Sequence, residues 1–138
     1  MSKVHPTSII DAGAVIGKEV EIGPWTLIGA DVVIGDNCRI GSHCVISGPT
    51  KMGANNNIHS FCVIGGDPQD KKFEPSRSSE LIIGEGNEIR EYCSVNRGTH
   101  AGGGITRLGN SNWIMAYCHI AHDCQVGNDI VLANNTTL

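Results

Sequence analysis

The chain has 138 residues, including 18 glycines and six cysteines, and only 4% of its residues are aromatic. This length corresponds to one domain with a core of its own. The net charge of −4 argues against a nucleic-acid-binding or membrane-surface protein.

The N-terminal stretch MSKVHPTSII contains no long apolar run. A signal peptide or a membrane-spanning helix would need one. We therefore expect no membrane insertion and a cytoplasmic location.

From Val4 onward, every sixth residue is aliphatic, and after two interruptions the same series reaches Leu138. This period fits neither an α-helix nor a simple alternating strand. It is typical of solenoids built from short repeats. Three hexapeptides would complete a triangular coil, and successive coils would stack about 4.8 Å apart, the spacing of neighbouring strands. The sequence therefore predicts an all-β parallel β-helix.

Two other positions keep the same register, counted from the aliphatic residue i. Position i+1 is often glycine, which permits either a positive φ or a close approach of backbones at a repeated corner. Position i+4 holds small or short residues and all six cysteines, namely Cys38, Cys44, Cys62, Cys93, Cys118 and Cys124. We interpret i+4 as a narrow inward site where a free cysteine packs as a small hydrophobic residue. Since no Cys-x-x-Cys spacing occurs, the cysteines do not indicate a metal or redox site.

The two interruptions define the domain organisation. We expect one domain over residues 1–138, with insertions at about 66–82 and 97–107 that bulge out and rejoin the count at its next step. On this count both insertions leave the same face in adjacent coils. The next step on that face contains His122. The same count places four aromatic residues in one outward column: Trp25, Phe61, Tyr92 and Tyr117. An exposed apolar column indicates a subunit contact, with packing under a neighbouring loop as the alternative.

The face that carries the insertions also carries the candidate catalytic group. His122 is followed by Asp123, and Arg97 should lie about one strand spacing away in the preceding coil. An imidazole titrates near neutral pH and can take a proton from a hydroxyl, while a carboxylate neighbour can orient it. His119 also faces outward. A solvated surface could hold these histidines without a function, so their clustering with the insertions is the stronger indication.

A zinc site is the alternative for these histidines. Catalytic zinc takes three protein ligands. His119 and His122 supply two, and His100 could be a third only if its loop folds back. We therefore predict no metal.

Several segments together resemble one enzyme family: HPTSIIDAGAVIG, IGGDPQDKKF, EPSR, NRGT, GGGITRLG and AYCHIAHDCQVGNDIVLANNTTL. They resemble the UDP-N-acetylglucosamine O-acyltransferases that open lipid A synthesis, and the likeness covers the full chain. The resemblance implies a left-handed parallel β-helix that forms a homotrimer with active sites between subunits. It implies transfer of a 3-hydroxyacyl chain from acyl carrier protein to the 3-hydroxyl of UDP-N-acetylglucosamine, without a cofactor or metal.

The resemblance also implies roles for individual residues. His122 would be the general base, and Asp123 would orient it. His119 would contact the substrate, and the insertion residues Gln69, Asp70 and Lys72 would hold the nucleotide sugar. In the NRGT motif, Asn96 and Arg97 would also contact the substrate. Asn96 stands where the family more often has histidine, a change that could alter the preferred sugar.

Family members continue beyond the position of Leu138 with further coils and a helical C-terminal domain. Those parts carry the oxyanion donor and the pocket that measures the acyl chain. Neither the further coils nor the helical domain occurs in this sequence. Two alternatives therefore stand beside the O-acyltransferase. One is the sister UDP-acyl-glucosamine N-acyltransferase, against which the QDKK and EPSR segments argue. The other is a truncated, non-catalytic β-helix trimer.

Overall fold

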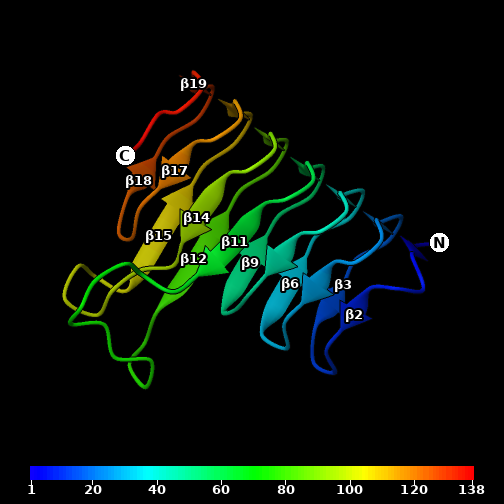
Figure 1. The fold of residues 1–138 in the computed structure, drawn as a ribbon, viewed down its shortest axis with the longest axis horizontal. Helices are drawn as coiled ribbons and strands as arrows, with labels where there is room; N and C mark the ends of the chain where they lie inside the picture. Colours follow the sequence, from blue (N-terminus) through cyan, green and yellow to red (C-terminus); the bar gives the residue numbers. More distant parts are fainter.

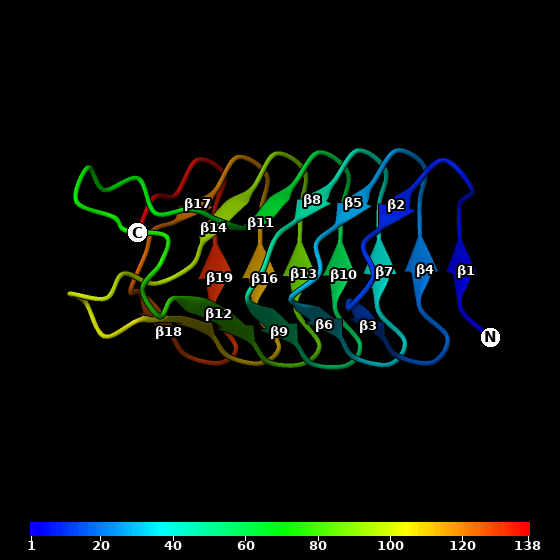
Figure 2. The same cartoon turned by 90° about the horizontal axis from the view of Figure 1, so that it is seen from below.

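The computed structural model describes residues 1–138 and contains strands β1 to β19 but no helix. The strands wind into a three-sided prism in which each side is a parallel sheet (Figure 1). The first and last strands lie toward opposite ends of the prism, and two long connections project beyond it (Figure 2). None of the chain forms a helix with the length and hydropathy that crossing a membrane requires.

Each sheet contains every third strand. Sheet A has seven strands: β1 (Lys3–Val4), β4 (Glu21–Ile22), β7 (Arg39–Ile40), β10 (Asn57–Ile58), β13 (Glu88–Ile89), β16 (Trp113–Ile114) and β19 (Val131–Leu132). Sheet B has six: β2 (Ile9–Ile10), β5 (Leu27–Ile28), β8 (Val45–Ile46), β11 (Val63–Gly66), β14 (Ser94–Asn96) and β17 (His119–Ile120). Sheet C has six: β3 (Val15–Ile16), β6 (Val32–Ile34), β9 (Thr50–Met52), β12 (Glu80–Ile83), β15 (Ile105–Leu108) and β18 (Gln125–Val126).

The strand pairing confirms the predicted register on both sides of each interruption. Ile64 of β11 pairs with Val95 of β14, across the first insertion. Val95 in turn pairs with Ile120 of β17, across the second. Because the aliphatic residues remain opposite one another, each insertion is an excursion from the coil.

The insertions are shorter than the expected ranges of 66–82 and 97–107. The long connections cover residues 67–79 and 97–104, and the residues that follow already belong to β12 and β15. Leu81 and Thr106 are fully buried and lie opposite each other in the pairing of these strands. The inward-facing residues therefore begin two residues before Ile83 and Leu108, the aliphatic residues at which the sixfold series resumes.

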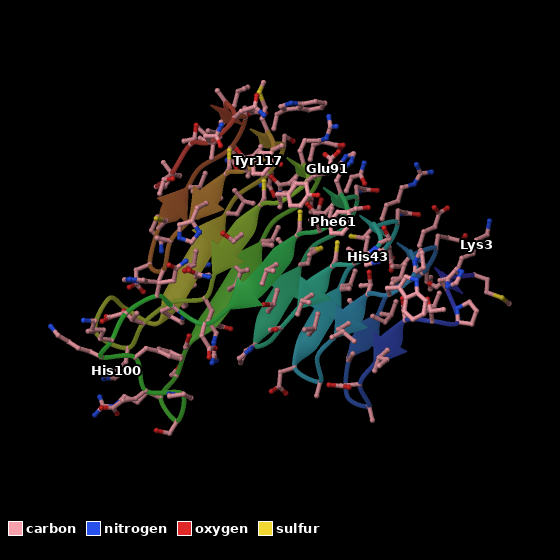
Figure 3. All side chains as sticks on the ribbon, in the orientation of Figure 1. Lys3, His43, Phe61, Glu91, His100 and Tyr117 are labelled. Carbon is pink, nitrogen blue, oxygen red and sulfur yellow. The ribbon has the colours of Figure 1, made fainter.

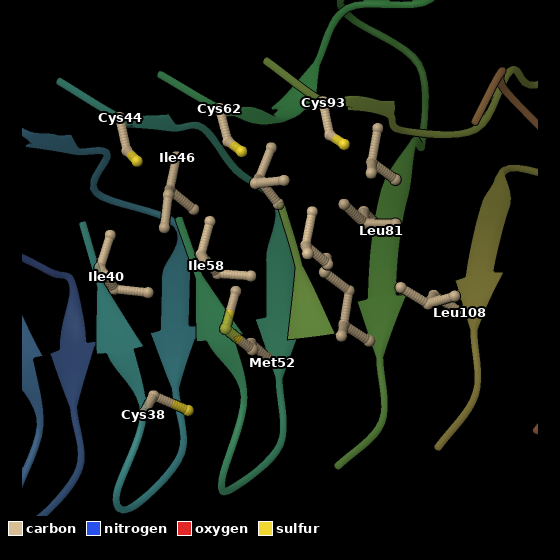
Figure 4. Close-up of a cluster of buried hydrophobic side chains, with 14 of the residues drawn as sticks. Cys38, Ile40, Cys44, Ile46, Met52, Ile58, Cys62, Leu81, Cys93 and Leu108 are labelled. Atoms are coloured by element: carbon tan, nitrogen blue, oxygen red, sulfur yellow. The ribbon is translucent and has the colours of Figure 1, made fainter. Parts of the chain in front are cut away.

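The interior follows the two predicted inward positions. Aliphatic residues at position i and small residues at i+4 form one core cluster, in which the cysteines of successive coils stand in a row (Figure 4). All six cysteines are free thiols, and only Cys124 is partly exposed. Burial raises the pKa of the Cys38 and Cys44 thiols, which keeps them protonated. The packing role predicted for the cysteines is therefore confirmed.

The i+4 side chains also join each coil to the next by hydrogen bonds, which the sequence analysis did not anticipate. The Thr26 hydroxyl donates to the Gly41 carbonyl at 2.8 Å. The Cys93 thiol donates to the Met115 carbonyl at 3.1 Å. Most residues at this inward site are therefore small and can donate a hydrogen bond, whereas Ala14, Val20 and Val32 fill it by packing alone.

Glycine at i+1 serves close approach, while the left-handed corner lies at i+3. A Cβ added at Gly35 would lie 2.5 Å from the carbonyl carbon of Gly53 in the next coil. The non-glycine residues with positive φ all occupy i+3, among them Phe61 (64°) and Asp123 (67°). Of the two reasons offered for the repeated glycines, close approach is thus the general one.

Candidate active site

Two insertions and the turn after β17 come together at one edge of the prism. Residues 67–79 leave from β11 and residues 97–104 leave from β14, and these strands are neighbours in sheet B. The two loops project together near the C-terminal coils (Figure 1). β17 is the next strand of the sheet, and His122 and Asp123 follow it. The predicted clustering of the insertions with His122 is therefore present.

The central contact is a hydrogen bond between Nδ1 of His122 and Oδ2 of Asp123, 2.7 Å long. The His122 side chain is 32% exposed, and that of Asp123 is 18% exposed. Asp123 occupies the left-handed corner position, which aspartate tolerates better than most residues. With Nδ1 directed at the carboxylate, Nε2 of His122 remains free to accept a proton.

The environment of Asp123 favours its ionised form. Burial by itself would raise the pKa of this carboxyl group. Hydrogen bonds from the Thr99 hydroxyl, the His122 ring and the Thr99 amide outweigh burial and hold the pKa below its usual value. At neutral pH the His122 ring therefore faces a carboxylate.

Thr99 is the site residue that sequence reasoning missed. Its backbone N–H donates to Oδ1 of Asp123 at 2.7 Å, and its hydroxyl donates to Oδ2 at 2.6 Å. It belongs to the NRGT segment, but the repeat does not describe the path of an insertion. A polar residue beside a glycine-rich loop was the only available signal.

The remaining predicted residues around β14 and β17 have other neighbours. Nδ1 of His119 lies 2.6 Å from the Ser94 hydroxyl, which leaves its Nε2 free. The Arg97 guanidinium donates to Asp67 at 2.7 Å and lies 5.0 Å from the centre of the Phe73 ring. Arg97 thus joins the two insertions and makes no hydrogen bond to His122.

Asn96 presents an unusual amide. The residue is 5% exposed, and its Oδ1 is a buried acceptor without a hydrogen-bond partner in the chain. Buried polar atoms are nearly always paired, and leaving one unpaired costs about 1–3 kcal/mol. The amide therefore has the capacity for a hydrogen bond that the chain itself does not supply.

A cavity of about 250 Å³ lies between the two insertions, lined by Asp70, Lys72, Phe73, Glu74, Arg77, Thr99, His100 and Ala101. Two predicted residues, Asp70 and Lys72, line it. Arg77 and His100 add basic side chains to the lining. Gln69 is exposed and is not among the lining residues. Thr99 links this cavity directly to Asp123.

A larger open hollow of about 660 Å³ lies over the N-terminal coils of sheet A, where Lys3, His5, Arg39 and His59 contribute to its lining. It is farther along the prism from the insertions, as the positions of Lys3 and His100 indicate (Figure 3). His59, which lines it, pairs with the Glu88 carboxylate at 2.5 Å, but none of the lining residues belongs to either insertion. The smaller cavity is therefore the better candidate, because of its link to the His122–Asp123 pair.

The zinc alternative finds no support in the geometry. No group of three or more His, Cys, Asp or Glu side chains is arranged to hold a metal ion. His100 projects on the second insertion (Figure 3), so it does not complete a ligand set with His119 and His122.

Comparison with known proteins identifies the family of the chain. The profile of the family described as bacterial transferase hexapeptide (six repeats) matches residues 31–66 and 105–138, about half of the chain. The acyl-[acyl-carrier-protein]–UDP-N-acetylglucosamine O-acyltransferase of Stenotrophomonas maltophilia is 54% identical over 99% of this chain and 51% of its own length. The enzyme of that name from Alkalilimnicola ehrlichii is 62% identical over the whole chain and 53% of its own length.

The solved structure of LpxA from Acinetobacter baumannii superposes with a TM-score of 0.95 at 43% identity, covering 97% of this chain and 52% of that one. Together with the three parallel sheets, this match confirms the predicted left-handed parallel β-helix. The chain spans about half the length of the curated relatives it matches. The chain thus belongs to the bacterial transferase hexapeptide family and is similar, over its whole length, to UDP-N-acetylglucosamine O-acyltransferases.

Proposed function

We propose that this chain is the β-helix portion of an O-acyltransferase of lipid A biosynthesis. It would move a 3-hydroxyacyl chain from acyl carrier protein to the 3-hydroxyl of UDP-N-acetylglucosamine. The observation that carries the proposal is the His122–Asp123 pair, linked through Thr99 to the cavity between the insertions. The name shared by the similar enzymes supplies the two substrates.

In the proposed reaction, the sugar 3-hydroxyl attacks the thioester carbonyl carbon of the acylated carrier. As the new C–O bond forms, Nε2 of His122 takes the hydroxyl proton. The C–S bond then breaks, and the proton on His122 neutralises the leaving thiolate. Asp123 remains ionised and stabilises the imidazolium that forms between these steps.

The cavity residues suit a nucleotide sugar. Lys72, with Arg77 and His100 nearby, supplies positive charge for the diphosphate. Asp70 offers a carboxylate to sugar hydroxyls, and Gln69 adds an exposed amide on the same insertion.

Three residues near β14 and β17 complete the proposed substrate site. The free Nε2 of His119 is available to the sugar or the acyl chain. Oδ1 of Asn96 is buried and unpaired in the chain, so it would accept a hydrogen bond from the sugar only if binding exposes it. Arg97 would act on the substrate indirectly, because its contacts with Asp67 and Phe73 hold the first insertion in place.

We further propose that three copies of the chain assemble into a homotrimer. Phe61, Tyr92 and Tyr117 stack on one another with ring centres 5.0 to 5.2 Å apart, and His43 extends the stack. The stack runs along an exposed corner of the prism (Figure 3). Beside it, sheet B exposes four aliphatic side chains in register: Ile9, Leu27, Val45 and Val63. An apolar surface of this extent is best explained by contact with another subunit.

A cytoplasmic location completes the proposal. All six cysteines are free thiols, and the reducing cytosol keeps thiols in that state.

The direct test is product formation. The purified chain is mixed with 3-hydroxyacyl carrier protein and UDP-N-acetylglucosamine, and the acylated sugar is measured by mass spectrometry. We expect product from the wild type and from His5→Ala, an exposed histidine of the first coil. His122→Ala should lower the rate by about 10²- to 10⁴-fold. Wild-type product no higher than that of His122→Ala would contradict the proposal and favour a non-catalytic β-helix trimer.

A further inference from the structure

We propose that Thr99 is a positioning residue of the active site. It would hold the carboxylate of Asp123 in the one orientation that directs Oδ2 at Nδ1 of His122. This inference rests on the proposed function for the role of His122 as a base, and it assigns a task to the second insertion.

Thr99 holds both oxygens of the Asp123 carboxylate. The amide and the hydroxyl of Thr99 donate to different oxygens of Asp123, at 2.7 Å and 2.6 Å. Two donors from one residue prevent the carboxylate from rotating about its Cβ–Cγ bond. The oxygen that the Thr99 hydroxyl holds, Oδ2, is also the oxygen that His122 contacts. Thr99 thus determines which oxygen His122 meets, and where.

A neighbouring amide sets the direction of the Thr99 hydroxyl. The amide of Gly102 donates to Oγ1 of Thr99 at 3.0 Å. That bond occupies the hydroxyl as an acceptor, so its single hydrogen is directed to Asp123. Gly102 also lies against the carboxylate, and a Cβ at this position would overlap Oδ2 of Asp123. The second insertion therefore needs glycine at this position for close approach to Asp123.

The segments that carry Thr99 and Asp123 are each held by further hydrogen bonds. Thr99 is only 5% exposed. The neighbouring Gly98 is held by Glu80, whose carbonyl accepts its amide at 3.1 Å. On the other side, the amide of Asp123 donates to Oγ1 of Thr106 at 2.9 Å. Each partner is therefore anchored to sheet C, and the carboxylate is preorganised before any substrate arrives.

A matched pair of variants tests the inference. Thr99→Val keeps the shape and the backbone donor but removes the hydroxyl, whereas Thr99→Ser keeps the hydroxyl. Two measurements distinguish a positioning role from a purely structural one. They are the pKa of Asp123 from carboxyl ¹³C titration and the tautomer of His122 from ¹⁵N NMR of the imidazole. Wild type and Thr99→Ser should give a low Asp123 pKa and a single His122 tautomer with the proton on Nδ1.

Thr99→Val should raise the pKa of Asp123, because the hydroxyl hydrogen bond that stabilises the carboxylate is gone. The His122 signals should become a mixture of tautomers, and kcat should fall by up to about 100-fold with little change in KM. Gly102→Ala, which displaces Asp123 without altering Thr99, should shift both NMR readouts in the same direction. It serves as the second test if Thr99→Val does not fold. Wild-type values for the Asp123 pKa and the His122 tautomer in both variants would overturn the inference.

The outcomes separate the two proposals. If the wild type makes no acylated sugar but Thr99→Val changes both NMR readouts, the proposed function fails and the positioning role stands. If the wild type makes product and Thr99→Val leaves both readouts and kcat unchanged, the positioning role fails and the proposed function stands.

Discussion

Asparagine side chains form a ladder inside the prism, and its removal should destabilise the fold by a predictable amount. Asn56, Asn87 and Asn112 occupy the inward i+4 position in three successive coils, and each is at most 2% exposed. The amide of Asn87 donates to the Gly109 carbonyl at 2.8 Å and to Oδ1 of Asn56 at 3.0 Å. Its own Oδ1 accepts the backbone N–H of Asn112 at 2.9 Å.

Asn87→Ala leaves the Gly109 carbonyl and the Asn112 amide without partners. An unpaired buried group costs about 1–3 kcal/mol, so two cost about 2–6 kcal/mol. This is a large part of the roughly 5–15 kcal/mol that stabilises a typical domain. Asn87→Thr should cost much less, because a threonine in this position both donates and accepts, as Thr26 does. The stability of Asn87→Cys should lie between those of Asn87→Thr and Asn87→Ala, since a thiol donates but accepts weakly.

Urea unfolding followed by far-ultraviolet circular dichroism measures these free energies, with an unchanged slope required for the comparison. The predicted order of stability is wild type, Thr, Cys, Ala. Asn134→Ala, at an exposed position, is the control and should change little. If the free energy of unfolding of Asn87→Ala lies within about 0.5 kcal/mol of that of this control, the ladder does not stabilise the coils and the reasoning is wrong.

Three further predictions concern other parts of the molecule. Gly35→Ala should destabilise the fold strongly, because its Cβ would meet Gly53. Gly127→Ala, whose Cβ would have nothing within 4 Å, should unfold like wild type. Equal urea midpoints for the two variants would refute this. The lowered pKa of Asp123 contributes stability above its unfolded pKa of about 3.9. This contribution is lost as pH falls through the folded pKa. The stability difference between wild type and Asp123→Asn should therefore shrink in acid, and a pH-independent difference would exclude this linkage. Tyr92→Glu places a charge in the aromatic stack and should convert a trimer to monomer in light scattering; a monomeric wild type would rule out the interface.

The repeat allowed most of the fold to be predicted, because a period of six residues converts sequence position into position on the prism. The prediction extended across both insertions, and Ile64, Val95 and Ile120 pair as expected. The stack of Phe61, Tyr92 and Tyr117 lies in the predicted column. His43 was overlooked there because only Phe, Tyr and Trp were counted, although imidazole also stacks.

The parts that escaped prediction depend on contacts outside the repeat. Periodicity places Asp123 at a corner but does not say that Thr99, from an insertion, meets it there. The buried amide of Asn96 also depends on how an insertion leaves its strand. The inter-coil hydrogen bonds were missed for another reason, since small size alone explains residues such as Thr26 in the inward site.

The most direct test of the account is the position of the sugar nucleotide in a complex. A crystal structure with UDP-N-acetylglucosamine should place the diphosphate beside Lys72 in the cavity between the insertions. The sugar 3-hydroxyl should lie within about 2.6–3.2 Å of Nε2 of His122. A nucleotide bound in the hollow over sheet A, or a 3-hydroxyl turned away from His122, would contradict the assignment of His122 as the base.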